Sequence, residues 1–93
     1  MTYRLVYESG AEQLASQLPP DVKPLVKRAI ERLRSNPHLG KELRFELAGY
    51  RSLRSRRYRV IYRVRDPERV VEVHYFGHRR EVYETFRDML SKR

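Results

Sequence analysis

Two segments with a two-residue periodicity flank a proline-containing turn, and they restrict the fold more than any other feature of the sequence. In RYRVIYRVR, tyrosine and valine occupy alternate positions from Tyr58 to Val64, and the apolar segment VVEVHYF follows at residues 70–76. The intervening DPER, residues 66–69, has Pro at the second position of a four-residue turn. This pattern predicts an antiparallel pair of strands whose tyrosines and valines face a core.

The same rules divide the rest of the chain into helices and strands. Pro19-Pro20 separates two segments with helical spacing, and Pro24 is acceptable because it falls in the first turn of the second helix. In chain order, the sequence predicts a strand at residues 2–8, helices at 11–18 and 21–34, strands at 43–47, 50–54, 57–65 and 70–76, and a helix at 80–90. Ser9 and Gly10 are expected to cap the first helix, and Gly77 to end the last strand.

These elements predict an α+β fold. We expect a small antiparallel sheet, an N-terminal helical hairpin and a short C-terminal helix, with the helices over one sheet face. The 93 residues are enough for one domain with one core, spanning 1–93.

Composition narrows the cellular setting and the kind of partner. The chain has no cysteine, no apolar run near the roughly 20 residues that cross a bilayer, and no apolar block at its N-terminus. We therefore expect a soluble, cytoplasmic protein without a membrane partner. The formal net charge is +9, and residues 44–80 hold 11 arginines against four acidic residues. Such a local excess favours a polyanionic partner, foremost nucleic acid, or an acidic protein partner.

The arginines fall on the strand parity opposite to the predicted core. If the helices cover one face of the sheet, the other face displays arginines from neighbouring strands, which lie about 4.8 Å apart. A solvated basic face is the simplest alternative. The positions concerned are Arg51, Arg54, Arg57, Arg59, Arg63, Arg79 and Arg80.

The segment LAGYRSLRSRRYRVIYRV, followed by a turn, an apolar strand and GHRREVY, resembles the RelE/ParE superfamily of bacterial and archaeal toxins, on the RelE side. The most specific part is YRVIY followed, about fifteen residues later, by GHR and a closing Tyr. The resemblance covers nearly the whole chain and implies the microbial RNase-like RelE fold. It also implies the toxin of a type II toxin–antitoxin system, a ribonuclease that enters the ribosomal A site and cuts mRNA there.

By the same resemblance, the toxin forms an oligomer with a RelB-like antitoxin, and it needs no metal or other cofactor. The ribose 2′-OH attacks its neighbouring phosphate, giving a cyclic phosphate and a free 5′-OH. The family motif places its functional residues at Arg59, Arg79 and Tyr83, and Arg54 falls where relatives tend to carry a basic residue.

The chemistry of phosphate transesterification is consistent with these roles. The phosphorane gains charge, so fixed guanidinium groups at Arg59 and Arg79 stabilise it more than the ground state. Tyr83 is a candidate general base, because neighbouring cations favour the phenolate of a tyrosine. Alternatively, Tyr83 stacks on a nucleobase and orients it.

The chain departs from the family pattern in the strand before YRVIY. RelE enzymes carry lysines there, one of them a proton donor to the leaving group, whereas this strand has Tyr50 and Ser52 at the matching places. Arginine is a poor proton donor. His78 is therefore a candidate acid, or Arg51 and Arg54 stabilise charge without supplying a proton.

Substrate binding is assigned to the remaining basic positions and one aromatic. These are Arg51, Arg57, Arg63, Arg80 and Tyr50. His38 is expected in an exposed loop and His74 in a structural or surface role; their spacing with His78 does not favour a metal site.

Two rival functions belong to other classes. A ParE-like protein inhibits DNA gyrase by binding it, without nuclease activity; GHRREVY argues against this and the missing lysines argue for it. A catalytically weak nucleic-acid-binding relative fits the charge alone.

Overall fold

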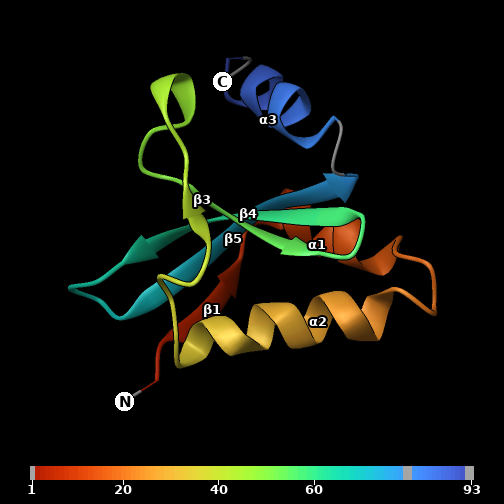
Figure 1. The fold of residues 1–93 in the computed structure, drawn as a ribbon, viewed down its shortest axis with the longest axis horizontal. Coiled ribbons are helices and arrows are strands. Elements are labelled where there is room, and N and C mark those ends of the chain that lie inside the picture. The colour runs from red at the N-terminus through yellow and green to blue at the C-terminus, as the bar shows by residue number, and fades with distance from the viewer. Residues whose placement is uncertain (1, 79–80, 92–93) are drawn as a thin grey trace.

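The computed structural model describes residues 2–78 and 81–91 and contains a five-stranded sheet with helices on both faces (Figure 1). The sheet order is β1-β5-β4-β3-β2. The strands are β1 (Arg4–Tyr7), β2 (Lys41–Glu42), β3 (Arg51–Ser55), β4 (Tyr58–Arg65) and β5 (Val70–His78). The helices are α1 (Ser9–Ser16), α2 (Lys23–Glu31) and α3 (Val82–Ser91), with short 3-10 helices η1 (Arg32–Arg34) and η2 (Phe45–Leu47).

The predicted hairpin of β4 and β5 is confirmed and forms the centre of the sheet. Its turn closes with a bond from the Arg69 amide to the Asp66 carbonyl at 3.1 Å, and the two strands pair antiparallel. Two details differ from prediction. Strand β1 pairs parallel to β5, so the sheet is mixed, and β5 continues through Gly77 to His78 instead of ending there.

A shift of register in β5 changes which side chains face each side of the sheet. Ile61 lies opposite Tyr75, whereas the next residue of β4, Tyr62, lies opposite Val73. His74 is thus an extra residue, as in a β-bulge. The bulge lets Val73 and Phe76 both face the first core.

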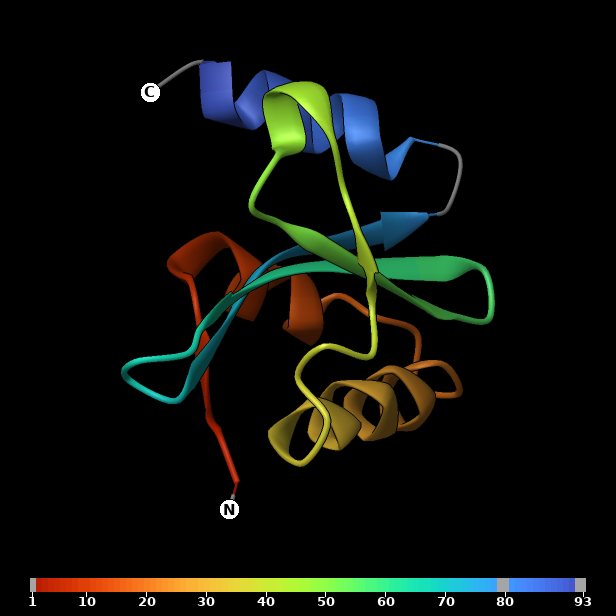
Figure 2. The same cartoon turned by 60° about the vertical axis from the view of Figure 1, so that its left-hand side comes forward.

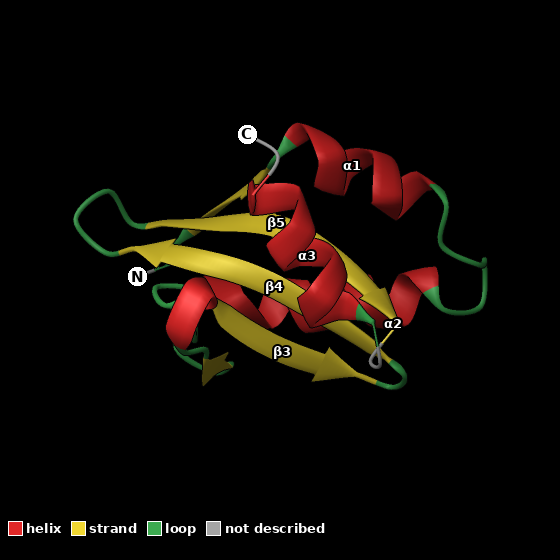
Figure 3. Ribbon diagram, turned by 90° about the horizontal axis from the view of Figure 1, so that it is seen from above, coloured by secondary structure: helices red, strands yellow, loops and turns green. Residues whose placement is uncertain are grey.

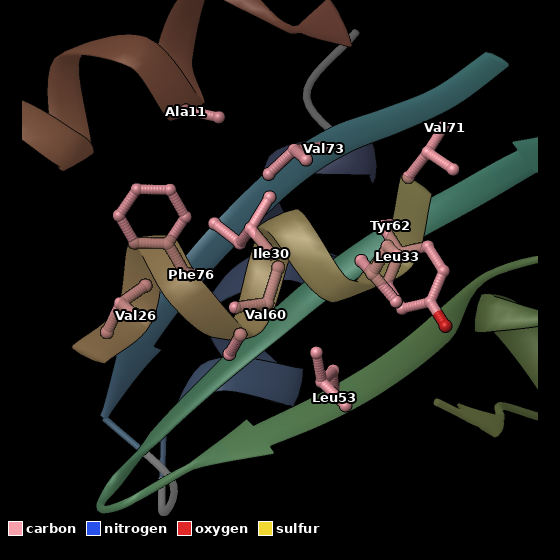
Figure 4. Packing of buried hydrophobic residues seen from close by; sticks show 11 residues of the cluster. Ala11, Val26, Ile30, Leu33, Leu53, Val60, Tyr62, Val71, Val73 and Phe76 are labelled. Atoms are coloured by element: carbon pink, nitrogen blue, oxygen red, sulfur yellow. The ribbon is translucent and has the colours of Figure 1, made fainter. Parts of the chain in front are cut away.

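The first core lies between the sheet and the helices α1 and α2 (Figure 4). As predicted, Val60 and Tyr62 of β4 are fully buried in it, with Tyr58 and Val64 packed at its margin. The amphipathic α2 contributes Val26, Ala29 and Ile30 from one stripe. Instead of a tight helical hairpin, α1 contacts β1 and β5 while α2 contacts β3. Ser9 and Gly10 lie inside the first turn of α1, and Glu8 is its N-cap residue without a side-chain bond.

A second core on the opposite face corrects the expectation that all helices cover one side. Helix α3 lies across β4 and β5 there (Figures 2 and 3). Its buried residues Val82 and Phe86 pack against Ile61 of β4 and Leu47 of η2. The physical reason is that Ile61 shares the arginine parity, so that face has an apolar centre that must be covered.

The segment predicted as a strand at residues 43–47 is not a strand, and its last three residues form the 3-10 helix η2. The β2–β3 pairing covers only Lys41–Glu42, and a bond from the Leu43 amide to the Tyr50 carbonyl at 3.0 Å follows it. Leu47 is buried against α3, whereas Phe45 has a positive φ of 58° and is 88% exposed. Packing of Leu47 on the second core therefore overrides the local period of two.

The loop before β2 is fixed to the first core by one phenol. The Gly40 amide donates to the Tyr62 hydroxyl at 2.8 Å, and that hydroxyl donates to the Pro37 carbonyl at 2.9 Å. Burial raises the pKa of Tyr62, with the Gly40 bond acting in the opposite direction. A side chain at position 40 would begin 2.6 Å from the phenolic oxygen, so only glycine fits there.

Candidate active site

Two arginines lie directly opposite each other on adjacent strands, on the face of the sheet that α3 partly covers. Arg54 of β3 is the cross-strand partner of Arg59 of β4, and Gly77 of β5 continues the row on the other side. Like charges opposite each other on a sheet are destabilising. Ion pairs within the described residues engage other arginines, namely Arg34, Arg51, Arg63 and Arg65. The Arg54–Arg59 pair is thus a place where an anion would relieve repulsion.

Arg59 also has an unsatisfied buried donor. Its Nε atom is shielded from solvent and has no hydrogen-bond partner among the residues that the structure describes. Buried guanidinium donors almost always have partners, so an orphaned one marks a place that a ligand or water occupies in use. The guanidinium carbon lies 5.8 Å from the centroid of the Tyr83 ring, over its face. The Arg59 cation and the Tyr83 phenol therefore lie against each other.

Tyr83 also contacts a residue of a second strand, β3. Its hydroxyl oxygen lies 3.0 Å from the Oγ of Ser52 in β3, and either hydroxyl is able to donate. Tyr83 belongs to the first turn of α3 and packs at the edge of the second core. Tyr83 therefore contacts both Arg59 and Ser52, and Arg54 lies opposite Arg59 on the adjoining strand.

Aromatic rings form the base of this face. Phe86 of α3 is central: its ring centroid is 5.1 Å from that of Tyr50 and 6.1 Å from that of Tyr75. The β-bulge brings His74 and Tyr75 onto the same side, since both rings contact Phe86. Tyr75 lies along Gly77, where an added Cβ would be 3.3 Å from the ring. The contacts of Tyr50 with Phe86 and His74 are those of a packing residue.

Glu72 neutralises the arginines at the other end of β4, Arg63 and Arg65. Its carboxylate accepts bonds from Arg63, Arg65 and His74, and its side chain is only 12% exposed. Burial by itself raises the pKa of Glu72, but the bonds from Arg65, His74 and Arg63 outweigh it and leave the pKa lowered. Arg63 is therefore committed to an ion pair and also lies 5.5 Å over the Tyr50 ring. Its charge is largely compensated within the fold.

Two of the predicted site residues lie on the opposite face of the sheet from Arg59, and a third lies in a turn. Arg51 has the opposite parity and donates to the Gly40 carbonyl at 2.8 Å and to Glu42 at 3.0 Å, which fixes the loop before β2. His78 lies opposite Tyr58, with ring centroids 4.9 Å apart, on the first-core face. Arg57 is exposed in the β3–β4 turn. Arg79 and Arg80, also predicted site residues, lie outside the described residues.

The histidines are not gathered at one place. His38 pairs with Asp66 at 3.2 Å, His74 with Glu72 at 3.1 Å, and His78 with the Tyr58 ring. Bonds from Tyr3 and then His38 lower the pKa of Asp66. Glu8, Glu72 and His74 place ligand atoms within 4.8 Å of one another, but the Glu72 oxygens already accept from two guanidinium groups. The donor set of that group is therefore ill suited to a cation.

Sequence reasoning missed Ser52 and Tyr75 as parts of this face. Ser52 shares its strand parity with Arg54. The family resemblance marks it only as a place where RelE enzymes carry a lysine. Parity alone would have put it beside Arg54. Tyr75 has the wrong parity for this face unless the bulge is known, and no residue in β5 signals the bulge.

Comparisons with known proteins agree with the geometry. The family described as ParE toxin of type II toxin-antitoxin system, parDE, matches residues 11–83. Toxin RelG of Mycobacterium tuberculosis is 34% identical over 85 residues, which are 89% of this chain and 98% of RelG. The chain belongs to the RelE/ParE superfamily of type II toxin–antitoxin toxins.

Solved structures of this superfamily share the fold. The RelBE2 toxin–antitoxin complex of M. tuberculosis contains a chain that is 33% identical, with a TM-score of 0.77; 85% of this chain and 100% of that chain are covered. A mutant of Escherichia coli RelE in the free state matches at 22% identity with a TM-score of 0.80, covering 99% and 98%. The second likeness concerns the fold alone. In the described part of this toxin, no helix combines the length and the apolar character needed to cross a membrane.

Proposed function

We propose that this toxin is a ribosome-dependent mRNA endoribonuclease that inhibits translation in the cytoplasm. The observation that carries the proposal is the Arg59 guanidinium, whose buried Nε has no partner among the described residues, with an arginine on the adjacent strand and a phenol ring against its plane. An anion accepts bonds from such a group, and an RNA phosphate beside Tyr83 fits it. The RelG relative supports a RelE-type activity.

In the proposed reaction, the ribose 2′-OH attacks the adjacent phosphorus and the 5′-oxygen leaves. The products are a 2′,3′-cyclic phosphate and a 5′-OH end, and no metal ion takes part. Arg59 and Arg54 stabilise the charge that develops on the phosphorane, and Arg79 joins them by the family motif. Tyr83 takes the proton of the 2′-OH, or it stacks on a base and orients the nucleotide.

The acid that protonates the leaving oxygen is not assigned to a side chain. His78 lies on the opposite face of the sheet. By the family resemblance, Ser52 stands where RelE enzymes carry a lysine. We propose that Arg54 and Arg59 compensate the departing charge electrostatically, which predicts slower cleavage than an enzyme with a lysine at that place.

We further propose a RelB-like antitoxin as the partner and the ribosomal A site as the place of action. Solved toxin–antitoxin complexes of M. tuberculosis RelBE2 and E. coli RelBE contain chains similar to this one, the latter 25% identical with a TM-score of 0.73. An acidic or apolar antitoxin segment would neutralise the arginine face or displace α3, which carries Tyr83.

A second candidate function is inhibition of DNA gyrase. Two observations favour it: the matching family is described by ParE toxins, and Ser52 replaces the strand lysine. Inhibition of gyrase, however, gives no role to the buried Nε donor of Arg59 or to the contact of Arg59 with Tyr83.

The two functions are separated by inducing the toxin in cells and measuring protein synthesis and plasmid supercoiling. The ribonuclease proposal expects translation to stop with supercoiling unchanged. It also expects Arg59→Met to reduce cleavage by about 100-fold, the loss typical for one transition-state donor. Arg32→Met, an exposed arginine next to α2, is the matched control and should be as toxic as the parent. Collapse of supercoiling with translation intact would refute the proposal.

A further inference from the structure

Ser52 is one of few buried polar residues among those described, and its side chain is enclosed at the boundary between the sheet and α3. It is 2% exposed and lies opposite Ile61, which is fully buried in the second core. A buried hydroxyl without a partner destabilises a fold, so its bonds are informative. The side-chain bond that the structure gives Ser52 goes to the Tyr83 hydroxyl, at 3.0 Å.

Two strands fix the Tyr83 phenol at two different points. Arg59 of β4 lies over the ring face at 5.8 Å from its centroid, while Ser52 of β3 contacts the oxygen at the far end of the ring. The ring contact restricts the plane, and the hydroxyl contact restricts where the oxygen lies within that plane. Packing of α3 on the sheet would not by itself restrict the phenol in this way, because Tyr83 is in the first turn of the helix and only partly buried.

We propose that Ser52 is a positioning residue that fixes the phenolic oxygen of Tyr83 beside the Arg59 anion site. Its importance for cleavage rests on the proposed ribonuclease function. Small displacements of a reacting group cost large factors in rate, so a phenol held by one hydrogen bond is sensitive to its loss.

The alternative is that the contact only gives the buried Ser52 hydroxyl a hydrogen-bond partner and links α3 to the sheet. Both interpretations predict a loss of stability in Ser52→Ala, so stability alone does not separate them. They differ in what happens to the position of Tyr83 and to the chemical step.

The test combines two measurements on Ser52→Ala, Tyr83→Phe, the double variant and Ser52→Thr. In the isolated full-length toxin with ¹³C-labelled tyrosine, we expect Ser52→Ala to move the Cζ resonance of Tyr83 and Ser52→Thr to restore it. In single-turnover cleavage of ribosome-bound mRNA, we expect Ser52→Ala to lower the rate about tenfold at unchanged affinity, as the loss of one hydrogen bond implies. The double variant should be no slower than Tyr83→Phe.

The inference is overturned if the Tyr83 resonance is unchanged in Ser52→Ala. It is also overturned if Ser52→Ala slows cleavage by the same factor in the parent and in the Tyr83→Phe background. A change confined to stability, with rate and affinity as in the parent, also overturns it. If the parent toxin itself fails to cut mRNA while the resonance still moves, the contact stands and the ribonuclease proposal falls. Failure of the two proposals is therefore distinguishable.

Discussion

Replacing Arg59 with methionine should make the toxin more stable while lowering its activity about 100-fold. The substitution keeps the length of the side chain but removes a charge and a buried donor. The Nε of Arg59 has no partner within the described residues, and its cross-strand neighbour is Arg54. Most surface substitutions on a sheet are neutral or destabilising, so a gain would be diagnostic.

The expected magnitude follows from three effects. An unsatisfied buried donor costs about 1–3 kcal/mol, and a like charge directly opposite costs about 0.2–1 kcal/mol. Against these, the contact of the guanidinium with the Tyr83 ring contributes about 0.5–1 kcal/mol at a partly exposed site. At the midpoints of these ranges the balance favours Arg59→Met by about 2 kcal/mol, and each kcal/mol raises the Tm of a domain of this size by about 4–8 °C.

The assay is thermal and urea unfolding of the purified toxin, with Arg63→Met as the matched control. Arg63 lies on the same strand and face but is paired with Glu72. Its removal should lower stability by about 0.5–1 kcal/mol, because the pair is partly exposed. Inorganic phosphate should raise the Tm of the parent more than that of Arg59→Met. If Arg59→Met lowers the Tm as Arg63→Met does, the view of Arg59 as an anion site is wrong.

Two further predictions concern residues that hold the fold. Glu72 has a lowered pKa, so its contribution to stability is complete above the unfolded value of about 4.3 and is lost as the pH falls through the folded value. Glu72→Gln should therefore be less stable by about 1–2 kcal/mol at pH 7, with a difference that narrows below pH 4 in urea titrations; an equal difference at pH 3 and pH 7 would contradict this. Gly40→Ala should lower stability by about 1–3 kcal/mol, because its Cβ would lie 2.6 Å from the Tyr62 hydroxyl and 2.9 Å from the Ser52 carbonyl. Gly10→Ala, with open space around it, is the control and should not destabilise the toxin.

Residues with strong local periodicity allowed most of the fold to be predicted from sequence. The β4–β5 hairpin and its DPER turn, the stripe of α2 and the C-terminal helix all follow from spacing and turn chemistry. The second core did not follow, because Ile61 was one apolar residue among arginines. Its partner Leu47 sits in a segment whose alternation resembled a strand.

The candidate site was predictable only where strand parity suffices. Arg54, Arg59 and the motif residue Tyr83 lie together, as parity and the family resemblance imply. Arg51 and His78 do not join them: the first lies on the other parity, and the second is one residue beyond Gly77 on the first-core face. The role of Ser52 depends on how closely α3 approaches β3, which no local pattern encodes.

The central claim is tested most directly by identifying the ends of mRNA after incubation of programmed ribosomes with the purified toxin. The account predicts cuts within the codon in the A site, with 5′-OH downstream ends and 2′,3′-cyclic phosphate upstream ends. It also predicts that Arg59→Met cuts about 100-fold more slowly than the parent, while Arg32→Met cuts like the parent. Intact mRNA with the parent, 5′-phosphate ends, or full cleavage by Arg59→Met would contradict it.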